Sequence, residues 1–255
     1  MDTITRLAVV DRRLQSIALP SLIRPPVGPD DDPTEDLVYW ATKFYVYSSI
    51  AHVRTLLSGL LALIQAGNKP SADVICRNIF EWAAHACYVR EHLTPSIKGK
   101  KWAAAFTLLT KASGANRWLK KHGRKYPEAV PSDEIPTFAG VGDLVNAYDA
   151  YQTKEFGNGD AKEAYSFLSE HSHPNGACFL EYREISGAEV RFVSPEAPNS
   201  FPNTNRSLLD WMTFHHSLLA LAHEDSVREQ LVTILTHAVA PSSPGGMNSV
   251  PAGIP

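Results

Sequence analysis

The chain has 255 residues, of which 44% are hydrophobic and 20% are charged, and this composition is typical of a globular domain rather than a disordered protein. The formal net charge of −3 at pH 7 excludes a protein that coats nucleic acid by overall charge, although a local basic patch remains compatible with it. The three cysteines, Cys76, Cys87 and Cys178, form no CxxC pair, which indicates reduced thiols in a reducing compartment.

The apolar stretches bear on where the protein resides. Residues 1–20 contain Asp11, Arg12 and Arg13 and lack the apolar run of a signal peptide. The most apolar window, 56–64, is far shorter than the roughly 20 residues that a membrane-spanning helix needs. We therefore expect a cytoplasmic protein with no membrane span.

Capping residues and helical periodicity predict the helices. The second of them begins at Thr34, which caps it, and ends before Gly67. The third begins at Pro70 and ends before Pro95, because proline lacks the N–H that a helix interior requires. In chain order, the predicted helices cover residues 2–19, 34–66, 70–93, 97–122, 141–152, 160–172 and 203–238.

Three segments depart from this pattern. The first, 123–140, is rich in Pro and Gly and predicts a long loop. In 178–193, two runs with aromatic and β-branched residues flank Ser-Gly-Ala-Glu, which predicts a small β-hairpin. The tail, 241–255, has a composition typical of disorder.

Long helices joined by short turns are typical of an antiparallel bundle. The sequence therefore predicts a mainly α fold in which a single helical-bundle domain covers residues 1–240. This bundle has five to seven helices, and the small β-hairpin is inserted before the last one.

A polar stripe runs along the otherwise apolar helix predicted over 70–93. At 100° per residue, Arg77, Glu81 and Tyr88 lie within about 40° of one another. A helix that is apolar nearly all round belongs inside the bundle, and an unpaired charge there costs about 3–5 kcal/mol. We therefore expect Arg77 and Glu81 to pair, either as a structural ion pair or as part of a site.

A second polar stripe consists of Tyr165, Ser169 and His173, which repeat every four residues and share one helix face. A Ser one turn from a His can place a hydroxyl beside a general base, but no carboxylate that would orient this His is identified. The alternative is that Ser169 and His173 cap the helix end. Because both stripes lie on apolar helices, we expect Arg77, Glu81, Ser169 and His173 to form one cluster.

The motifs Arg77-x-x-x-Glu81 and Tyr165-x-x-x-Ser169-x-x-x-His173 resemble the pattern of a bacterial all-helical family of unknown function. More remotely they are similar to the HEPN group (higher eukaryotes and prokaryotes nucleotide-binding), many of whose members are ribonucleases in toxin or phage-defence systems. The resemblance covers about residues 34–175 and implies a helical bundle with a polar centre and a role in defence. The spacing of Arg77 and His85 departs from that of the HEPN nuclease motif.

Residues 98–125 form the most unusual stretch by charge, because they hold nine of the 24 Lys and Arg residues and no acid. Aromatic residues interleave with the charges, a combination typical of surfaces that pair with phosphates and stack on bases. The alternative is a solvated face neutralised by the acids of 30–32 or 133–134, or by another subunit. The candidate nucleic-acid-binding residues are Lys100, Lys101, Arg117, Lys120, Lys121, Arg124 and Lys125.

Motifs for metals and cofactors are not recognised, since the chain lacks HExxH, GxGxxG and Walker A sequences. Glu81 and His85, one helical turn apart, come nearest to a ligand pair, and His215, His216 and His223 add donors on the last helix. Histidines on apolar helices are more often buried structural residues. No metal and no cofactor are expected.

Two functional hypotheses follow. In the first, an intracellular bacterial protein binds or cleaves RNA in stress or phage defence: Arg77 binds phosphate, His173 transfers protons, and Glu81 and Ser169 orient them. In the second, a non-enzymatic, homo-oligomeric adaptor uses the same residues as a buried structural network. A basic groove leading to Arg77 would favour RNA, whereas basic residues buried against acids would favour the adaptor.

Overall fold

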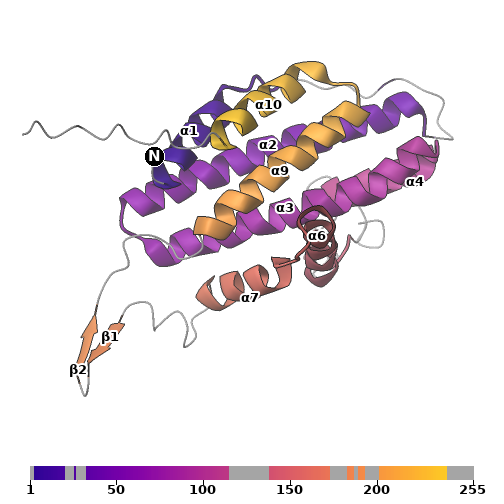
Figure 1. Ribbon diagram of the computed structural model, residues 1–255. Coiled ribbons are helices and arrows are strands. Elements are labelled where there is room, and N and C mark those ends of the chain that lie inside the picture. Colours follow the sequence, from indigo (N-terminus) through magenta and orange to yellow (C-terminus); the bar gives the residue numbers. More distant parts are fainter. Residues whose placement is uncertain are drawn as a thin grey trace, which may run out of the picture.

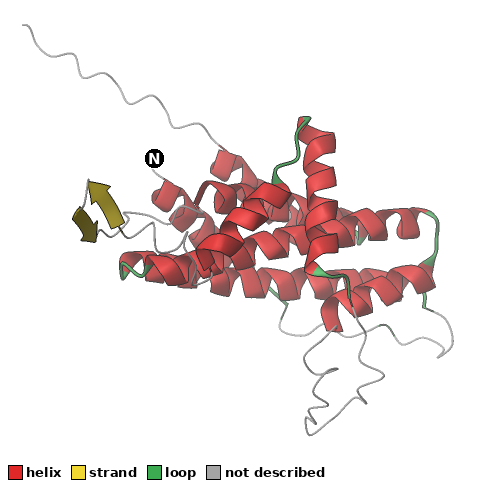
Figure 2. Cartoon of the chain, turned by 90° about the horizontal axis from the view of Figure 1, so that it is seen from below, coloured by secondary structure: helices red, strands yellow, loops and turns green. Residues whose placement is uncertain are grey.

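A computed structural model describes residues 3–20, 26, 33–114, 138–172, 183–186, 189–192 and 201–239. The described part is mainly helical (Figure 2), which confirms the predicted fold class. Within these ranges there are eight helices: α1 (Thr3–Ser16), α2 (Glu35–Gln65), α3 (Lys69–Lys98), α4 (Trp102–Gly114), α6 (Val141–Phe156), α7 (Ala161–Ser172), α9 (Phe201–Leu221) and α10 (Asp225–Val239).

Helix α3 is the centre of the bundle. It packs against α2, α4, α6, α7 and α9 (Figure 1). Apolar side chains cover most of its circumference and are almost completely buried, among them Ile79, Phe80, Val89 and Leu93. The prediction that a helix apolar nearly all round lies inside the bundle is therefore confirmed.

The start of α2 follows the predicted capping. The Thr34 hydroxyl accepts a hydrogen bond from the Leu37 amide at 3.3 Å, and Glu35 and Asp36 occupy the first turn, where acids interact favourably with the helix dipole. Helix α2 ends at Gln65, and Gly67 has φ of +71°. Glycine adopts this left-handed backbone without steric strain.

Helix α3 does not end before Pro95, as predicted, but continues to Lys98. Pro95 removes one backbone donor, and the preceding Thr94 donates its hydroxyl to the Arg90 carbonyl at 2.8 Å. The extra turn buries Ile97, which is 8% exposed. The prediction was wrong because a proline this close to the helix end removes a single hydrogen bond, which the packing of one more turn outweighs.

The predicted last helix, 203–238, is two helices. Helix α9 ends at Leu221 and α10 begins at Asp225, with His223 between them at φ of +51°. The chain then reverses, so that α10 packs against α9 and α1. This break raises the number of described helices above the predicted five to seven, and no proline or glycine marks it in the sequence.

Two four-residue strands, β1 (Arg183–Ser186) and β2 (Glu189–Phe192), pair in antiparallel fashion, with Arg183 opposite Phe192. Both fall within 178–193, but residues 187–188 between them lie outside the described residues, so the hairpin stays a prediction. The predicted loop over 123–137, the part of the fourth helix beyond residue 114 and the tail over 241–255 also lie outside the described residues.

One described helix, α2, is long and apolar enough by length and composition to cross a membrane. The core helix of a globular protein meets the same criteria, and α2 packs against α1, α3, α4 and α9. The cytoplasmic location and the lack of a membrane span stay predictions.

Candidate functional site

Arg77 makes two side-chain hydrogen bonds, one within α3 and one that connects α3 to α7. Its Nε donates to Oε1 of Glu81 at 3.0 Å, and one Nη donates to the hydroxyl of Tyr165 at 2.9 Å. The guanidinium carbon also lies 5.3 Å from the centre of the Tyr165 ring, a distance at which the cation is attracted to the ring face. The expected Arg77–Glu81 pair is confirmed, and the two polar stripes face each other at Tyr165.

The Arg77–Glu81 pair is only partly buried. The side chains of Arg77 and Glu81 are 23% and 30% exposed, so water reaches both charges. Burial lowers the pKa of Arg77, but the Glu81 charge, Tyr165 and their hydrogen bonds outweigh this effect and raise the pKa overall. The prediction that this helix lies inside the bundle implied a fully desolvated pair; that implication was wrong, because exposure depends on how closely α7 covers this face of α3.

Ser169 lies one turn beyond Tyr165 on α7, and its hydroxyl oxygen is buried. The Tyr165 ring packs against Phe80 of α3, with 5.9 Å between ring centres, and this contact helps to fix the α7 face on α3. His173 lies outside the described residues. The structure therefore brings Arg77 and Glu81 together with the Tyr165 face of α7, while the position and proton-transfer role of His173 stay predictions.

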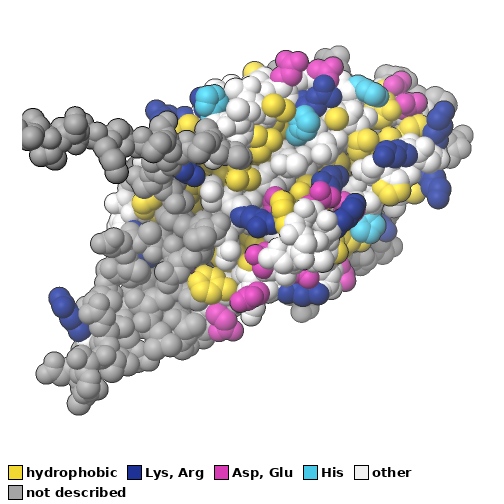
Figure 3. Space-filling view, viewed as in Figure 1, with side chains coloured by type: hydrophobic (Ala, Val, Ile, Leu, Met, Phe, Trp, Pro, Cys, Tyr) yellow, Lys and Arg dark blue, Asp and Glu magenta, His cyan; other side chains and the backbone are white. Residues whose placement is uncertain are grey.

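The basic stretch is described in part. Lys98, Lys100, Lys101 and Lys111 are exposed, and none pairs with an acid in the described part of the chain. We call these four lysines the basic end. Lys98, Lys100 and Lys101 lie where α3 passes into α4, an end of the molecule that carries several Lys and Arg side chains in Figure 3, and Lys111 lies in the last turn of α4. The other candidate nucleic-acid-binding residues, Arg117, Lys120, Lys121, Arg124 and Lys125, lie outside the described residues.

The lysines of the α3–α4 connection are distant from Arg77. At 1.5 Å per residue along α3, Lys98 lies about 31 Å from Arg77. Among the interleaved aromatic residues, Trp102 and Phe106 pack against the hydrophobic core, so they are not free to stack on bases.

Two histidines flank Tyr45, of which His215 is fully buried and His85 partly buried. The Tyr45 hydroxyl shares a hydrogen bond with Nδ1 of His85 at 2.8 Å, and the Tyr45 ring stacks on both His85 and His215. Nδ1 of His215 lies 2.8 Å from the Trp211 carbonyl oxygen, and this nitrogen carries the proton because a carbonyl only accepts. Burial lowers the pKa of His85 to about 4 and that of His215 to about 3, so both are neutral at pH 7.

Glu81 and His85, the pair in the sequence that comes nearest to a metal-ligand set, do not come together in the structure. His85 bonds to Tyr45 instead, while Glu81 bonds to Arg77. Across the residues that the structure describes, no three His, Cys, Asp or Glu side chains gather in a way that could hold a metal ion.

Sequence reasoning missed a buried carboxylate, Asp210, in the core between α6 and α9. The Tyr148 hydroxyl donates to its Oδ2 at 2.5 Å, and Nε of Arg206 lies 3.8 Å from the same oxygen. Burial raises the pKa of Asp210, and the Tyr148 hydrogen bond and Arg206 oppose that rise without cancelling it. The four-residue spacing of Arg206 and Asp210 could have indicated their pairing. The hydrogen bond from Tyr148 to Asp210 bridges 62 residues, and no pattern in the sequence indicates it.

Arg90 lies beside this carboxylate and was also missed. Its guanidinium carbon is 4.7 Å from the ring centres of both Tyr151 and Phe214. The charge is thus held between two aromatic faces, and Arg90 also pairs with Glu91 at 2.5 Å. The arrangement is that of a structural network that joins α3, α6 and α9.

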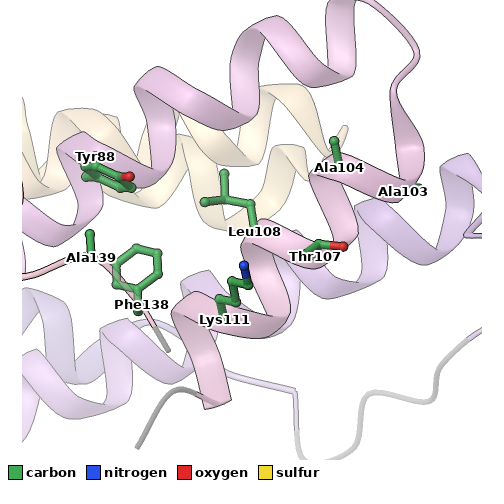
Figure 4. Close-up of a pocket in the computed structure, with 8 residues that line it drawn as sticks. All are labelled: Tyr88, Ala103, Ala104, Thr107, Leu108, Lys111, Phe138 and Ala139. Atoms are coloured by element: carbon green, nitrogen blue, oxygen red, sulfur yellow. The ribbon is translucent and has the colours of Figure 1, made fainter. Parts of the chain in front are cut away.

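Two pockets lie against α4. One, of about 500 Å³, is formed by α3, α4 and Phe138-Ala139, and Figure 4 shows the side chains that line it. The other, of about 310 Å³, lies between α2 and α4 and includes Trp40 and Phe44. Neither pocket contains Arg77 or Tyr165.

No protein-family model matches this sequence, and neither a curated protein nor a solved structure shows a significant match to it. Any role for the Arg77 cluster or the basic end therefore rests on geometry and charge.

Proposed function

We propose that the protein binds RNA through the basic end and the basic residues that follow it in the chain. The observation that carries this proposal is the exposure of Lys98, Lys100, Lys101 and Lys111 without an acidic partner in the described ranges. Like charges repel within a Debye length of about 8 Å at physiological salt. A bound phosphate chain removes that repulsion and releases its own counterions, which favours binding.

The dipole of α3 stabilises only part of the positive charge of the basic end. Lys98, in the last turn of α3, interacts favourably with the helix dipole. Lys100 and Lys101 follow the end of α3 and precede α4, so the dipole effect, which falls off within one turn, reaches them weakly. In this proposal an external anion, and not the acids of 30–32 or 133–134, which lie outside the described residues, neutralises these lysines.

The Arg77 cluster supplies the proposed catalytic role. Arg77 binds a phosphate oxygen, His173 transfers the proton, and Glu81 and Ser169 orient the two groups. Partial exposure of Arg77 and Glu81 leaves the cluster accessible to a substrate. Cleavage of RNA in stress or phage defence, in the cytoplasm, is the function that the HEPN resemblance implies.

Fluorescence anisotropy with a labelled, mixed-sequence single-stranded RNA tests the binding. We expect affinity to fall steeply between about 50 and 200 mM salt. The triple variant Lys98→Gln, Lys100→Gln, Lys101→Gln should lower the slope of log affinity against log salt by about 2, because each lost phosphate contact removes about 0.7 for single strands. The control is Lys154→Gln, which removes an exposed lysine of α6 and should leave the salt slope unchanged.

A second set of substitutions addresses the remaining charges. Replacing Lys120, Lys121, Arg124 and Lys125, which lie outside the described residues, by Gln is expected to abolish binding while the far-ultraviolet circular dichroism spectrum stays unchanged. Failure of the wild type to retain RNA even at low salt contradicts the proposal.

A non-enzymatic, homo-oligomeric interaction module is the second candidate function. The observation that favours it is the apolar pocket between α2 and α4, where Phe44 stacks on Trp40 with 5.7 Å between ring centres and is 43% exposed. In this candidate the Arg77 network is purely structural. Light scattering after gel filtration tests it: the wild type is expected to be a dimer that Phe44→Ser dissociates, whereas the equally exposed Val232→Ser on α10 leaves it intact.

A further inference from the structure

The larger pocket combines an apolar base with one cation. Ala103, Ala104 and Leu108 of α4 provide small and branched aliphatic side chains, while Tyr88 of α3 and Phe138 provide the aromatic ones. Figure 4 shows the nitrogen of Lys111 directed toward the space between Phe138 and Leu108. The volume of about 500 Å³ lies within the range of sites that hold small organic ligands.

The aromatic side of this pocket is held in place by its neighbours. Phe138 meets Tyr88 edge to face with 5.4 Å between ring centres, and it lies 4.7 Å from the ring of His85. Tyr88 in turn stacks on His92 at 4.0 Å. Rings that are fixed before binding lose little freedom when a ligand arrives, so a flat apolar group gains contact area at low cost in entropy.

The charge in the pocket is uncompensated. Lys111 is exposed and has no acidic partner among the described residues. A carboxylate placed at its amine forms a charge-assisted hydrogen bond, which is stronger than a neutral one. The Thr107 hydroxyl, also in the lining, offers a donor for a second oxygen.

We propose that this pocket binds a small planar aromatic carboxylate, with its ring against Tyr88, Phe138 and Leu108 and its carboxylate at Lys111. The site requires neither RNA nor the Arg77 cluster. It shares only Lys111 with the basic end, and the triple substitution of Lys98, Lys100 and Lys101 that tests RNA binding leaves its lining unchanged.

Calorimetric titration of the full chain with 2-naphthoate and with neutral 2-naphthalenemethanol tests the charge requirement. The wild type is expected to bind 2-naphthoate at least tenfold more tightly than the alcohol. Lys111→Gln should weaken naphthoate binding to the level of the alcohol and leave binding of the alcohol unchanged. The control Lys154→Gln removes an exposed charge outside the lining and should alter neither.

A second variant tests the location. Ala104 is exposed and lines the pocket, so Ala104→Trp is expected to fill the space without loss of folding and to abolish binding of both compounds. Thermal unfolding monitored by circular dichroism verifies that the variant is folded. Lack of naphthoate binding at millimolar concentration, equal affinity for the two compounds, or undiminished binding by folded Ala104→Trp would each overturn the proposal.

Discussion

At the scale of single residues, Arg77 has hydrogen-bond partners on its own helix and on a neighbouring one. Arg77 is held by Glu81 on its own helix and by Tyr165 on α7. Because both charges remain partly exposed, the energies involved are closer to those of surface pairs than to those of buried ones.

Glu81→Ala is expected to lower the free energy of unfolding by about 1 kcal/mol, because the Arg77 charge then lacks its carboxylate. Arg77→Met should lower it by less, since the apolar chain still packs over Tyr165. Urea unfolding at pH 7 measures both. Equal stability of wild type and both variants would show that solvent screens the pair completely.

His85 and His215 predict a loss of stability in acid. Their pKa values in the folded state, about 4 and about 3, lie below the unfolded value of about 6.5. The unfolded chain therefore binds protons first as the pH falls, so stability is complete above about pH 6.5 and declines below it by up to about 1.4 kcal/mol per pH unit for each histidine.

The measurement is urea unfolding at several pH values between 7 and 4.5. Replacing His215 by Phe preserves the stacking on Tyr45 and removes one titrating group, so the decline should become shallower. A pH profile that is flat in the wild type, or identical in His215→Phe, contradicts the assignment of these histidines as the acid-sensitive groups.

At the scale of elements, the end of α3 shows how local backbone structure moved a helix boundary from its predicted place. After Lys98 the chain closes α3 with two hydrogen bonds, from the Lys100 amide to the Ile97 carbonyl at 3.0 Å and from the Lys101 amide to the Ser96 carbonyl at 2.8 Å. This is the Schellman pattern, which usually carries glycine at the position with positive φ. Here that position is Lys100, with φ of +53°.

Lys100→Gly is expected to raise the free energy of unfolding by about 1 kcal/mol, because glycine relieves the left-handed strain of a side chain and this gain exceeds its entropy cost. Lys101→Gly, at the next residue and without positive φ, should not stabilise. Chemical unfolding of the two variants side by side measures the difference. Destabilisation by both would mean that the Lys100 side chain contributes more than its backbone strain costs.

At the scale of the whole molecule, α3 separates two regions of different character. The Arg77 cluster lies near its start, and Lys98, Lys100 and Lys101 of the basic end lie at its finish, with about 31 Å between Arg77 and Lys98 by helical rise. This distance is several times the Debye length of about 8 Å. Charges in one region therefore have little direct electrostatic effect on the other.

If the protein cleaves RNA, substitutions in the two regions are expected to impair different steps, cleavage in one case and binding in the other. Arg77→Met should abolish cleavage while anisotropy still reports RNA binding, and the triple substitution of Lys98, Lys100 and Lys101 should weaken binding while saturating RNA restores cleavage. Electrophoresis of labelled RNA products alongside the anisotropy measurement distinguishes the two. Loss of binding in Arg77→Met would place the main binding determinant at the cluster instead.

The sequence by itself determined the features that depend on neighbours within one or two helical turns. The Thr34 cap, the Gly67 stop, the apolar circumference of α3 and the Arg77–Glu81 spacing are of this kind, because caps and i,i+4 contacts form inside a single helix. Most helices, the mainly α fold and the central place of α3 follow from them.

Only the tertiary structure decided which contacts form between different helices. The bond from Arg77 to Tyr165 bridges 88 residues and that from Tyr148 to Asp210 bridges 62, while the exposure of the Arg77–Glu81 pair depends on where α7 lies. The continuation of α3 through Pro95 and the break at His223 were decided in the same way. Packing between distant segments outweighs the local preferences that periodicity and turn residues express, so these features could not be predicted from spacing alone.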